Sequence, residues 1–174
     1  VSEGLATAEG LFYGAKPDPR VVSITAGQGD LKRKQLKMGR DEMRLLQSMQ
    51  RALEESDEAR GRQLREFNVL SSQPTCTKQE VHWDGDYDPD KVRALRGRKP
   101  CSAILGLQLG ARLYVHDAAV GGLVTVLIPP GAILVFDGDV AHAGASYAGV
   151  NTRVHLYLDV PALQRDRDYT WFMG

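Results

Sequence analysis

The chain has 174 residues, and its 22 Lys and Arg balance its 22 Asp and Glu, so the formal net charge at pH 7 is zero. This length is enough for one domain with a substantial core, and 43% hydrophobic with 25% charged residues is typical of a globular protein. A balanced charge favours no class of partner, so only local clusters of charge can indicate one.

No segment approaches the roughly 18 apolar residues of a membrane span, which predicts no membrane partner. The first residues, VSEGLATAEG, lack the basic and then apolar pattern of a signal peptide. Cys76 and Cys101 are too few for a disulfide framework and form no CxxC motif, which indicates reduced, buried thiols. We therefore expect an intracellular protein, cytoplasmic or nuclear, although a targeting segment could have preceded this start, which lacks Met.

Residues 1–66 are predicted to be a lead-in followed by a supporting helix. Residues 1–30 are rich in Gly and Pro, with one apolar run at 21–24 that suggests a strand. Residues 31–66 begin with basic residues and continue with the apolar pattern of one helix face. The basic residues are Lys32, Arg33, Lys34, Lys37 and Arg40, and the apolar ones are Leu45, Leu46, Met49, Ala52 and Leu53.

From residue 67 onward the apolar pattern changes to that of short strands separated by Gly, Pro and Asp turns. The expected strands span 67–70, 79–83, 101–109, 112–115, 123–128, 132–136 and 152–160. Many short strands at close spacing predict an all-β sandwich or barrel, and a helix ahead of them is an α+β order. We expect one domain over 1–174, with a β core at 67–160 and a C-terminal extension at 161–174.

Three residues in the β-rich part could hold a metal ion. His82 and Asp84 stand two apart on an expected strand, so both side chains point to one face. His142 follows a strand and an Asp-Gly turn, and could complete a triad of two histidines and one carboxylate, the set that suits non-haem iron(II). An HxD pair alone is a weak signal, because Asp84 could instead open the turn that continues through Gly85 and Asp86.

The wider pattern resembles the iron(II)- and 2-oxoglutarate-dependent dioxygenases, closest to their prolyl-hydroxylase-like and phytanoyl-hydroxylase-like branches. The similarity covers about residues 67–160 and depends on a combination of motifs. These are His82-Trp83-Asp84, Ser102 to Leu107, Pro129-Pro130-Gly131 with the apolar run to Phe136, His142-Ala143-Gly144-Ala145, and Asn151-Thr152-Arg153. The resemblance implies a mainly β fold with a flanking helix, namely a double-stranded β-helix (a jelly-roll, cupin-like core).

The resemblance also implies that Arg153 binds the distal carboxylate of 2-oxoglutarate. A guanidinium presents a planar fork that matches a carboxylate. On a strand, Arg153, His155 and Tyr157 share a polar face, which either meets solvent or lines a cavity. His155 stands where some family members carry a serine that contacts 2-oxoglutarate, so we expect it to bind the cosubstrate or line the substrate pocket.

The activity implied is hydroxylation of a substrate C–H bond with Fe(II) and O2, coupled to oxidative decarboxylation of 2-oxoglutarate to succinate and CO2. Two alternatives stay open: a cupin-like metal oxygenase that does not use 2-oxoglutarate, and a non-catalytic β-barrel binding module. A basic loop at 91–99 could flank the site, although Asp86, Asp88 and Asp90 dilute its charge. The substrate, whether a protein side chain, a nucleic acid or a small molecule, and the oligomeric state are left undetermined.

Two further polar residues carry weaker expectations. Asp139 lies close to His142 in the chain and could orient its imidazole, or could simply be a turn residue at the end of a strand. His116 is followed by Asp117 in an expected turn, so we expect it at the surface.

Overall fold

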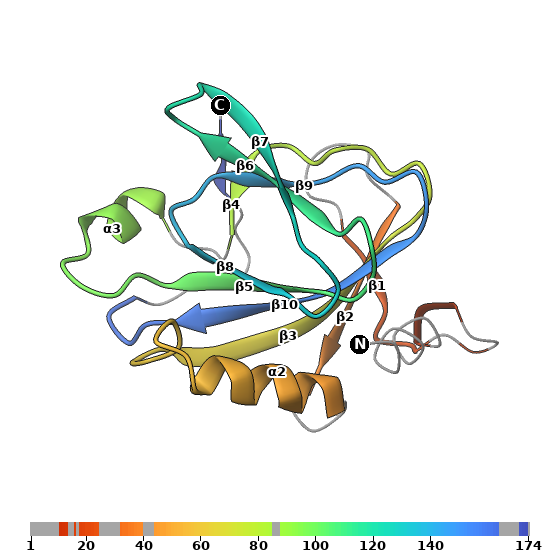
Figure 1. Ribbon diagram of the computed structural model, residues 1–174, viewed down its shortest axis with the longest axis horizontal. Coiled ribbons are helices and arrows are strands. Elements are labelled where there is room, and N and C mark those ends of the chain that lie inside the picture. The colour runs from red at the N-terminus through yellow and green to blue at the C-terminus, as the bar shows by residue number, and fades with distance from the viewer. Residues whose placement is uncertain are drawn as a thin grey trace.

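The computed structural model describes residues 11–13, 16, 18–24, 32–39, 44–84, 88–163 and 171–173. Two antiparallel sheets face each other, with one helix beneath them and a second at one side (Figure 1). The larger sheet has the order β1-β2-β3-β10-β5-β8, and the smaller has the order β11-β4-β9-β6-β7.

The elements have the following bounds. The larger sheet contains β1 (Val22–Ser23), β2 (Arg33–Met38), β3 (Gln63–Ser72), β5 (Cys101–Gly106), β8 (Ile133–Asp137) and β10 (Asn151–Asp159). The smaller sheet contains β4 (His82–Trp83), β6 (Arg112–Asp117), β7 (Gly122–Leu127), β9 (His142–Gly144) and β11 (Trp171–Phe172). The helices are α2 (Arg44–Glu54) and α3 (Pro89–Ala94).

The chain passes back and forth between the sheets, which is what makes the fold a double-stranded β-helix. After β3 it crosses to β4, returns to β5, makes the β6–β7 hairpin opposite, and then repeats the alternation through β8, β9 and β10. The predicted mainly β fold with a flanking helix is therefore confirmed. This winding places the ends of β4, β9 and β10 around the space between the sheets.

The main hydrophobic core lies outside the sandwich, between α2 and the larger sheet. Leu46, Met49 and Leu53 of α2 are buried against apolar side chains of β2, β3, β5 and β10. The apolar face of β10, formed by Val154, Leu156 and Leu158, belongs to this cluster and is fully buried. The period of the apolar residues thus predicted the helix correctly, because one face of α2 has to be covered by the sheet.

The basic segment ahead of α2 forms strand β2 over residues 33–38, although no strand was expected between residues 31 and 66. β2 pairs antiparallel with β3, from Arg33 opposite Ser72 to Met38 opposite Phe67. Arg33, one of the basic residues at the start of this segment, is only 1% exposed. The strand forms because β3 provides a complete row of backbone partners, a tertiary effect that local composition does not reveal.

The opposite face of β10 is turned toward the smaller sheet. Arg153, His155 and Tyr157 line a cavity of about 190 Å³ between the two sheets, together with His82 and His142. Of the two possibilities for this polar face, solvent or cavity, the structure shows the cavity.

None of the residues that the structure describes forms a helix long and apolar enough to cross a membrane.

Candidate metal centre

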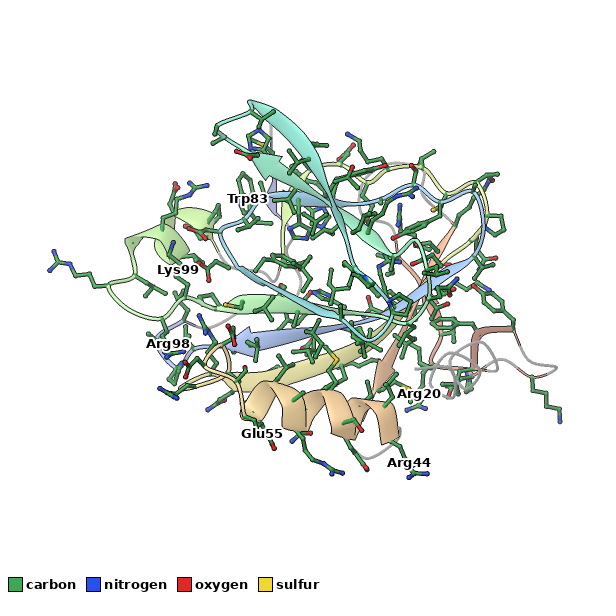
Figure 2. All side chains as sticks on the ribbon, viewed as in Figure 1. Arg20, Arg44, Glu55, Trp83, Arg98 and Lys99 are labelled. Carbon is green, nitrogen blue, oxygen red and sulfur yellow. The ribbon has the colours of Figure 1, made fainter. Side chains whose placement is uncertain are left out.

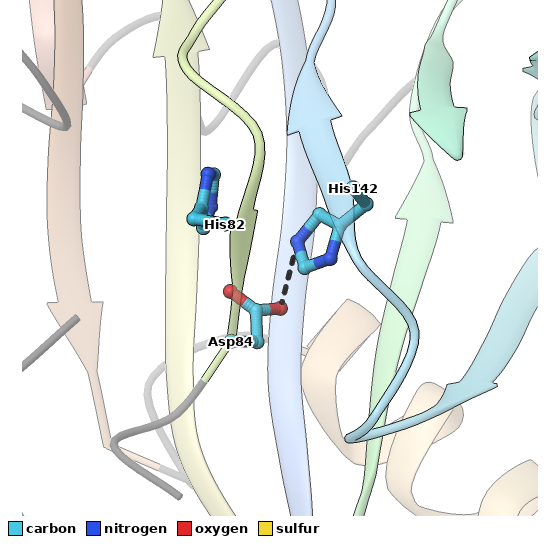
Figure 3. Close-up of side chains that lie close together, drawn as sticks. All are labelled: His82, Asp84 and His142. Carbon is cyan, nitrogen blue, oxygen red and sulfur yellow. Dashed lines mark ion pairs between the residues drawn. The ribbon is translucent and has the colours of Figure 1, made fainter. Parts of the chain in front are cut away.

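The three predicted ligands lie close together (Figure 3), and all three line the cavity. β4 and β9 pair antiparallel with His82 directly opposite His142, and the two rings are 4.8 Å apart between centroids. Asp84 follows β4 immediately, so its side chain points to the same face as that of His82. One nitrogen from each histidine and one carboxylate oxygen lie within 4.8 Å of one another.

Backbone contacts fix the orientation of both imidazoles. His82 Nδ1 is 2.8 Å from the carbonyl oxygen of Glu80, and His142 Nδ1 is 3.0 Å from that of Val140. Because a carbonyl oxygen can only accept, Nδ1 carries the hydrogen in each ring and Nε2 keeps its lone pair. This is the arrangement by which proteins orient histidine ligands toward a metal.

The charges at the centre also favour a cation. Burial lowers the pKa of His82, and the neighbouring imidazole of His142 lowers it further, which favours the neutral form that binds metals. Burial raises the pKa of Asp84, but His142 and His155 outweigh it and hold that pKa well below its usual range. Burial lowers the pKa of His142 as well, yet the carboxylate of Asp84 raises it above its ordinary value.

The donor set therefore fits a divalent metal. Asp84 Oδ2 is buried without a well-formed hydrogen bond, although it lies 3.4 Å from His142 Nε2. A buried carboxylate oxygen in this state gains from a cation beside it. Two imidazoles and one carboxylate are the ligands that suit non-haem iron(II), with coordination positions left for other molecules.

Arg153 lines the same cavity and is 5% exposed. Its Nη1 donates to Ser72 Oγ at 3.0 Å, and its Cζ lies 5.6 Å from the centre of the Tyr147 ring. The ring and the hydroxyl thus hold the guanidinium in position, as a carboxylate-binding fork requires. Gln35 also lines the cavity, and its Nε2 donates to Asn68 Oδ1 at 2.9 Å.

His155 extends from β10 toward the metal ligands rather than only toward Arg153. Its Nε2 is 3.0 Å from Asp84 Oδ2, and its ring meets that of Tyr157 edge-on at 4.7 Å between centroids. Neither Nε2 nor Oδ2 has a hydrogen bond of good geometry, so the contact is short but bent. The roles predicted for His155, in the cosubstrate site or the substrate pocket, stay predictions.

Sequence reasoning missed two residues that build the site. Arg33 donates to Ser72 Oγ at 3.1 Å and to the carbonyl of Ala145 at 2.9 Å, and it also contacts that of Thr77. Gln79 accepts from the backbone N–H of Gly144 at 3.0 Å, and a Cβ at Gly144 would lie 2.0 Å from its Oε1. The family's motif does contain Gly144, but nothing in the pattern indicates what fills the space beside it.

The basic loop at 91–99 is largely paired within the protein. Arg93 lies 2.7 Å from Asp90, Lys91 lies 3.9 Å from Asp88, and Lys99 lies 2.6 Å from Asp139. Arg93 also lies over the ring of Trp83, a residue that lines the cavity, at 5.7 Å from its centre. Trp83, Arg98 and Lys99 all lie on the α3 side of the molecule (Figure 2). Most of this charge is therefore neutralised locally.

The structure also places Asp139 and His116, the two polar residues with weaker expectations. The side chain of Asp139 pairs with Lys99, so it does not orient His142, which bonds to the backbone of Val140 instead. The backbone oxygen of Asp139 accepts from Trp83 Nε1 at 3.1 Å. His116 lies in β6, half-buried and opposite Leu123, and is not part of the cavity lining. The turn expected to continue through Gly85 and Asp86 lies outside the described residues.

Comparison with known proteins places the fold among oxygenases. No family profile and no curated protein sequence matches the chain. A prolyl-4-hydroxylase from Pseudomonas putida is 16% identical with a TM-score of 0.60, over 91% of this chain and 85% of that one. A prolyl hydroxylase from Trichoplax adhaerens, solved with a hypoxia inducible factor peptide, is 14% identical with a TM-score of 0.61, over 89% and 76%.

A third solved structure, the non-heme alpha ketoglutarate dependent carbocyclase SnoK from nogalamycin biosynthesis, is 16% identical with a TM-score of 0.59, over 91% of this chain and 74% of that one. The chain therefore has the double-stranded β-helix fold of 2-oxoglutarate-dependent oxygenases. At these identities the shared property is the fold, and the chemistry has to be argued from the residues of this chain.

Proposed function

We propose that this protein is an iron(II)- and 2-oxoglutarate-dependent oxygenase that hydroxylates a C–H bond of its substrate. The observation that carries the proposal is that Arg153 and the His82, Asp84 and His142 group line one cavity. A molecule with a metal-chelating 2-oxo acid at one end and a carboxylate at the other would meet a suitable partner at each end.

The first end of the cavity would hold the metal. His82 and His142 would bind through Nε2, because backbone carbonyls already take the hydrogen on Nδ1 of each ring. Asp84 would supply the carboxylate and part of the charge balance. When bound, iron(II) would supply oxidation by O2 coupled to decarboxylation of 2-oxoglutarate to succinate and CO2.

The second end of the cavity would bind the distal carboxylate of the cosubstrate. Arg153 is held by the Ser72 hydroxyl and the face of Tyr147, so little side-chain entropy remains to be lost on binding. Burial of the guanidinium strengthens its attraction for a carboxylate, since water screens the pair less.

Formation of succinate tests the proposal without knowledge of the substrate. The protein is incubated with Fe(II), ascorbate and 2-oxoglutarate in air, and succinate released by uncoupled turnover is measured. Anaerobic Fe(II) with 2-oxoglutarate is expected to give a weak visible charge-transfer band. His142→Ala should abolish both signals, and Arg153→Met should raise the KM for 2-oxoglutarate about 10- to 100-fold, the cost of losing a charged hydrogen bond.

Arg65→Met is the matched control, because Arg65 is an exposed arginine of β3 outside the cavity lining. It should leave succinate formation unchanged. Metal binding without the band or succinate would instead support a cupin-like oxygenase that does not use 2-oxoglutarate. Failure of the wild-type chain to bind metal would support a non-catalytic binding module.

A further inference from the structure

Among the described residues outside the triad, His155 makes a close contact with the carboxylate of Asp84. Its Nε2 is 3.0 Å from Asp84 Oδ2, closer than the 3.4 Å between His142 Nε2 and the same oxygen. The side chains of His155 and Asp84 are 8% and 13% exposed, so water screens the contact little. Within the described residues, neither atom has a hydrogen-bond partner of good geometry.

The position of His155 follows from the register of β10. The ring lies on the inner face of that strand, between its pairing partners Asn68 of β3 and Ile104 of β5. Directly after it the register shifts, where β3 carries a bulge with Glu66 at a positive φ of 51°. Tyr157 packs edge-on against the imidazole at 4.7 Å between centroids, which restricts rotation of the ring.

We infer that His155 is a positioning residue for the metal site, and that it donates its Nε2–H to Asp84. Each carboxylate oxygen has two lone pairs, so Oδ2 can accept from His155 and still face a cation, and the donor would fix the orientation of Asp84 as a ligand. Two buried polar atoms this close stabilise the site only as a donor and an acceptor, because a buried polar atom without a partner is costly.

The geometry argues against His155 as a fourth ligand. The ligand atoms that lie within 4.8 Å of one another belong to His82, Asp84 and His142, and this group does not include His155. A fourth protein ligand would also leave fewer coordination positions for other molecules than the triad does. The inference depends on the metal site of the proposed function, but it does not depend on the use of 2-oxoglutarate.

The test is the affinity of the metal-free protein for Co(II), measured by the visible spectrum without oxygen, 2-oxoglutarate or substrate. His155→Met removes the N–H donor but keeps a side chain of similar length. We expect the Kd of this variant for Co(II) to rise about 10- to 100-fold, as for other residues that orient a metal ligand. His155→Gln keeps an N–H at similar reach, so its Kd should stay within about 3-fold of wild type. His116→Met is the control for loss of a histidine outside the cavity.

Two outcomes would overturn the inference. If His155→Met bound Co(II) as tightly as wild type, His155 would not act through Asp84. If it lost Co(II) as completely as His142→Ala and the wild-type spectrum indicated a further nitrogen donor, His155 would be a ligand. If either variant failed to fold, judged by circular dichroism, His155→Leu and His155→Asn would replace them. Neither places an N–H at the reach of Nε2, so both should weaken Co(II) binding by a factor similar to that of His155→Met.

The same variants separate this inference from the proposed function. A role for His155 in binding 2-oxoglutarate predicts an altered KM for that cosubstrate with an unaltered Kd for Co(II). If wild type bound Co(II) but released no succinate, the proposed activity would fail while the effect of His155 on metal affinity could still be measured.

Discussion

His82 and His142 lie directly opposite each other across the antiparallel pair β4–β9, with ring centroids 4.8 Å apart. These residues are far apart in the sequence, so only the alternation of the chain between the two sheets brings them together. Each ring is anchored to the carbonyl two residues before it, Glu80 in one case and Val140 in the other. The fold therefore largely forms the site through strand pairing and these backbone contacts.

A largely formed site should couple metal binding to stability. We expect Co(II) at about 100 times its Kd to stabilise the fold by about 2.7 kcal/mol, which corresponds to a rise in Tm of about 5–10 °C. Differential scanning calorimetry with and without metal measures the shift, and a chelator should reverse it. In Asp84→Asn the shift should fall below about 2 °C; an undiminished shift would mean that the metal binds elsewhere.

Metal affinity should increase with pH above the ordinary pKa of histidine. The pKa of His142 is raised in the metal-free protein, because the attraction of Asp84 exceeds the opposing effect of burial. His142 therefore still carries a proton at a pH where a free imidazole has lost it, and the metal has to displace that proton. Isothermal titration in two buffers of different ionisation enthalpy should show proton release that declines as pH rises; uptake of protons would contradict this sign.

The sequence predicted the parts of the site that depend on strand alternation. The two-residue spacing of His82 and Asp84, and of Arg153 and His155, placed each pair on one face, and the cavity lining agrees. The sequence could not predict Arg33, because Lys32-Arg33-Lys34 has the composition of an exposed segment and becomes a strand only through pairing with β3. Nor could it predict the positive φ of Glu66, which no glycine marks.

Arg33 should be one of the costliest polar residues to replace. Its guanidinium joins β2 to Ser72 of β3 and to the carbonyl of Ala145 just after β9. Arg33→Met removes the donor to the carbonyls of Ala145 and Thr77, so we expect the free energy of unfolding to fall by about 1–3 kcal/mol. Urea denaturation measures the change. Lys34→Met, next to it on the opposite face, loses a contact with the Tyr13 ring, the one interaction of its charged group within the described part of the chain, and should cost no more than about 1 kcal/mol.

Cys101 should be inert toward thiol reagents in the folded protein. Burial raises the pKa of its thiol to about 12, so at pH 8 only about one molecule in ten thousand carries the reactive thiolate. In Cys76→Ala, where Cys101 is the one remaining cysteine, Ellman's reagent should react only after denaturation. Reaction within seconds at native pH would show that Cys101 is more accessible than its 5% exposure indicates.

Gly106 should tolerate no side chain, since it ends β5 where the chain passes under the loop that leads into β8. An added Cβ would lie 2.6 Å from the backbone oxygen of Ile128 and 2.7 Å from that of Pro129. Both are backbone atoms, so Gly106→Ala has to move the loop and should lower the free energy of unfolding by about 1–3 kcal/mol. Gly97→Ala, with no atom within 4 Å of its added Cβ, is the matched control and should change it by less than about 0.5 kcal/mol. Equal unfolding free energies for the two variants in urea would show that the loop at 128–129 moves without loss of stability. The close approach of this loop would then not require glycine at position 106.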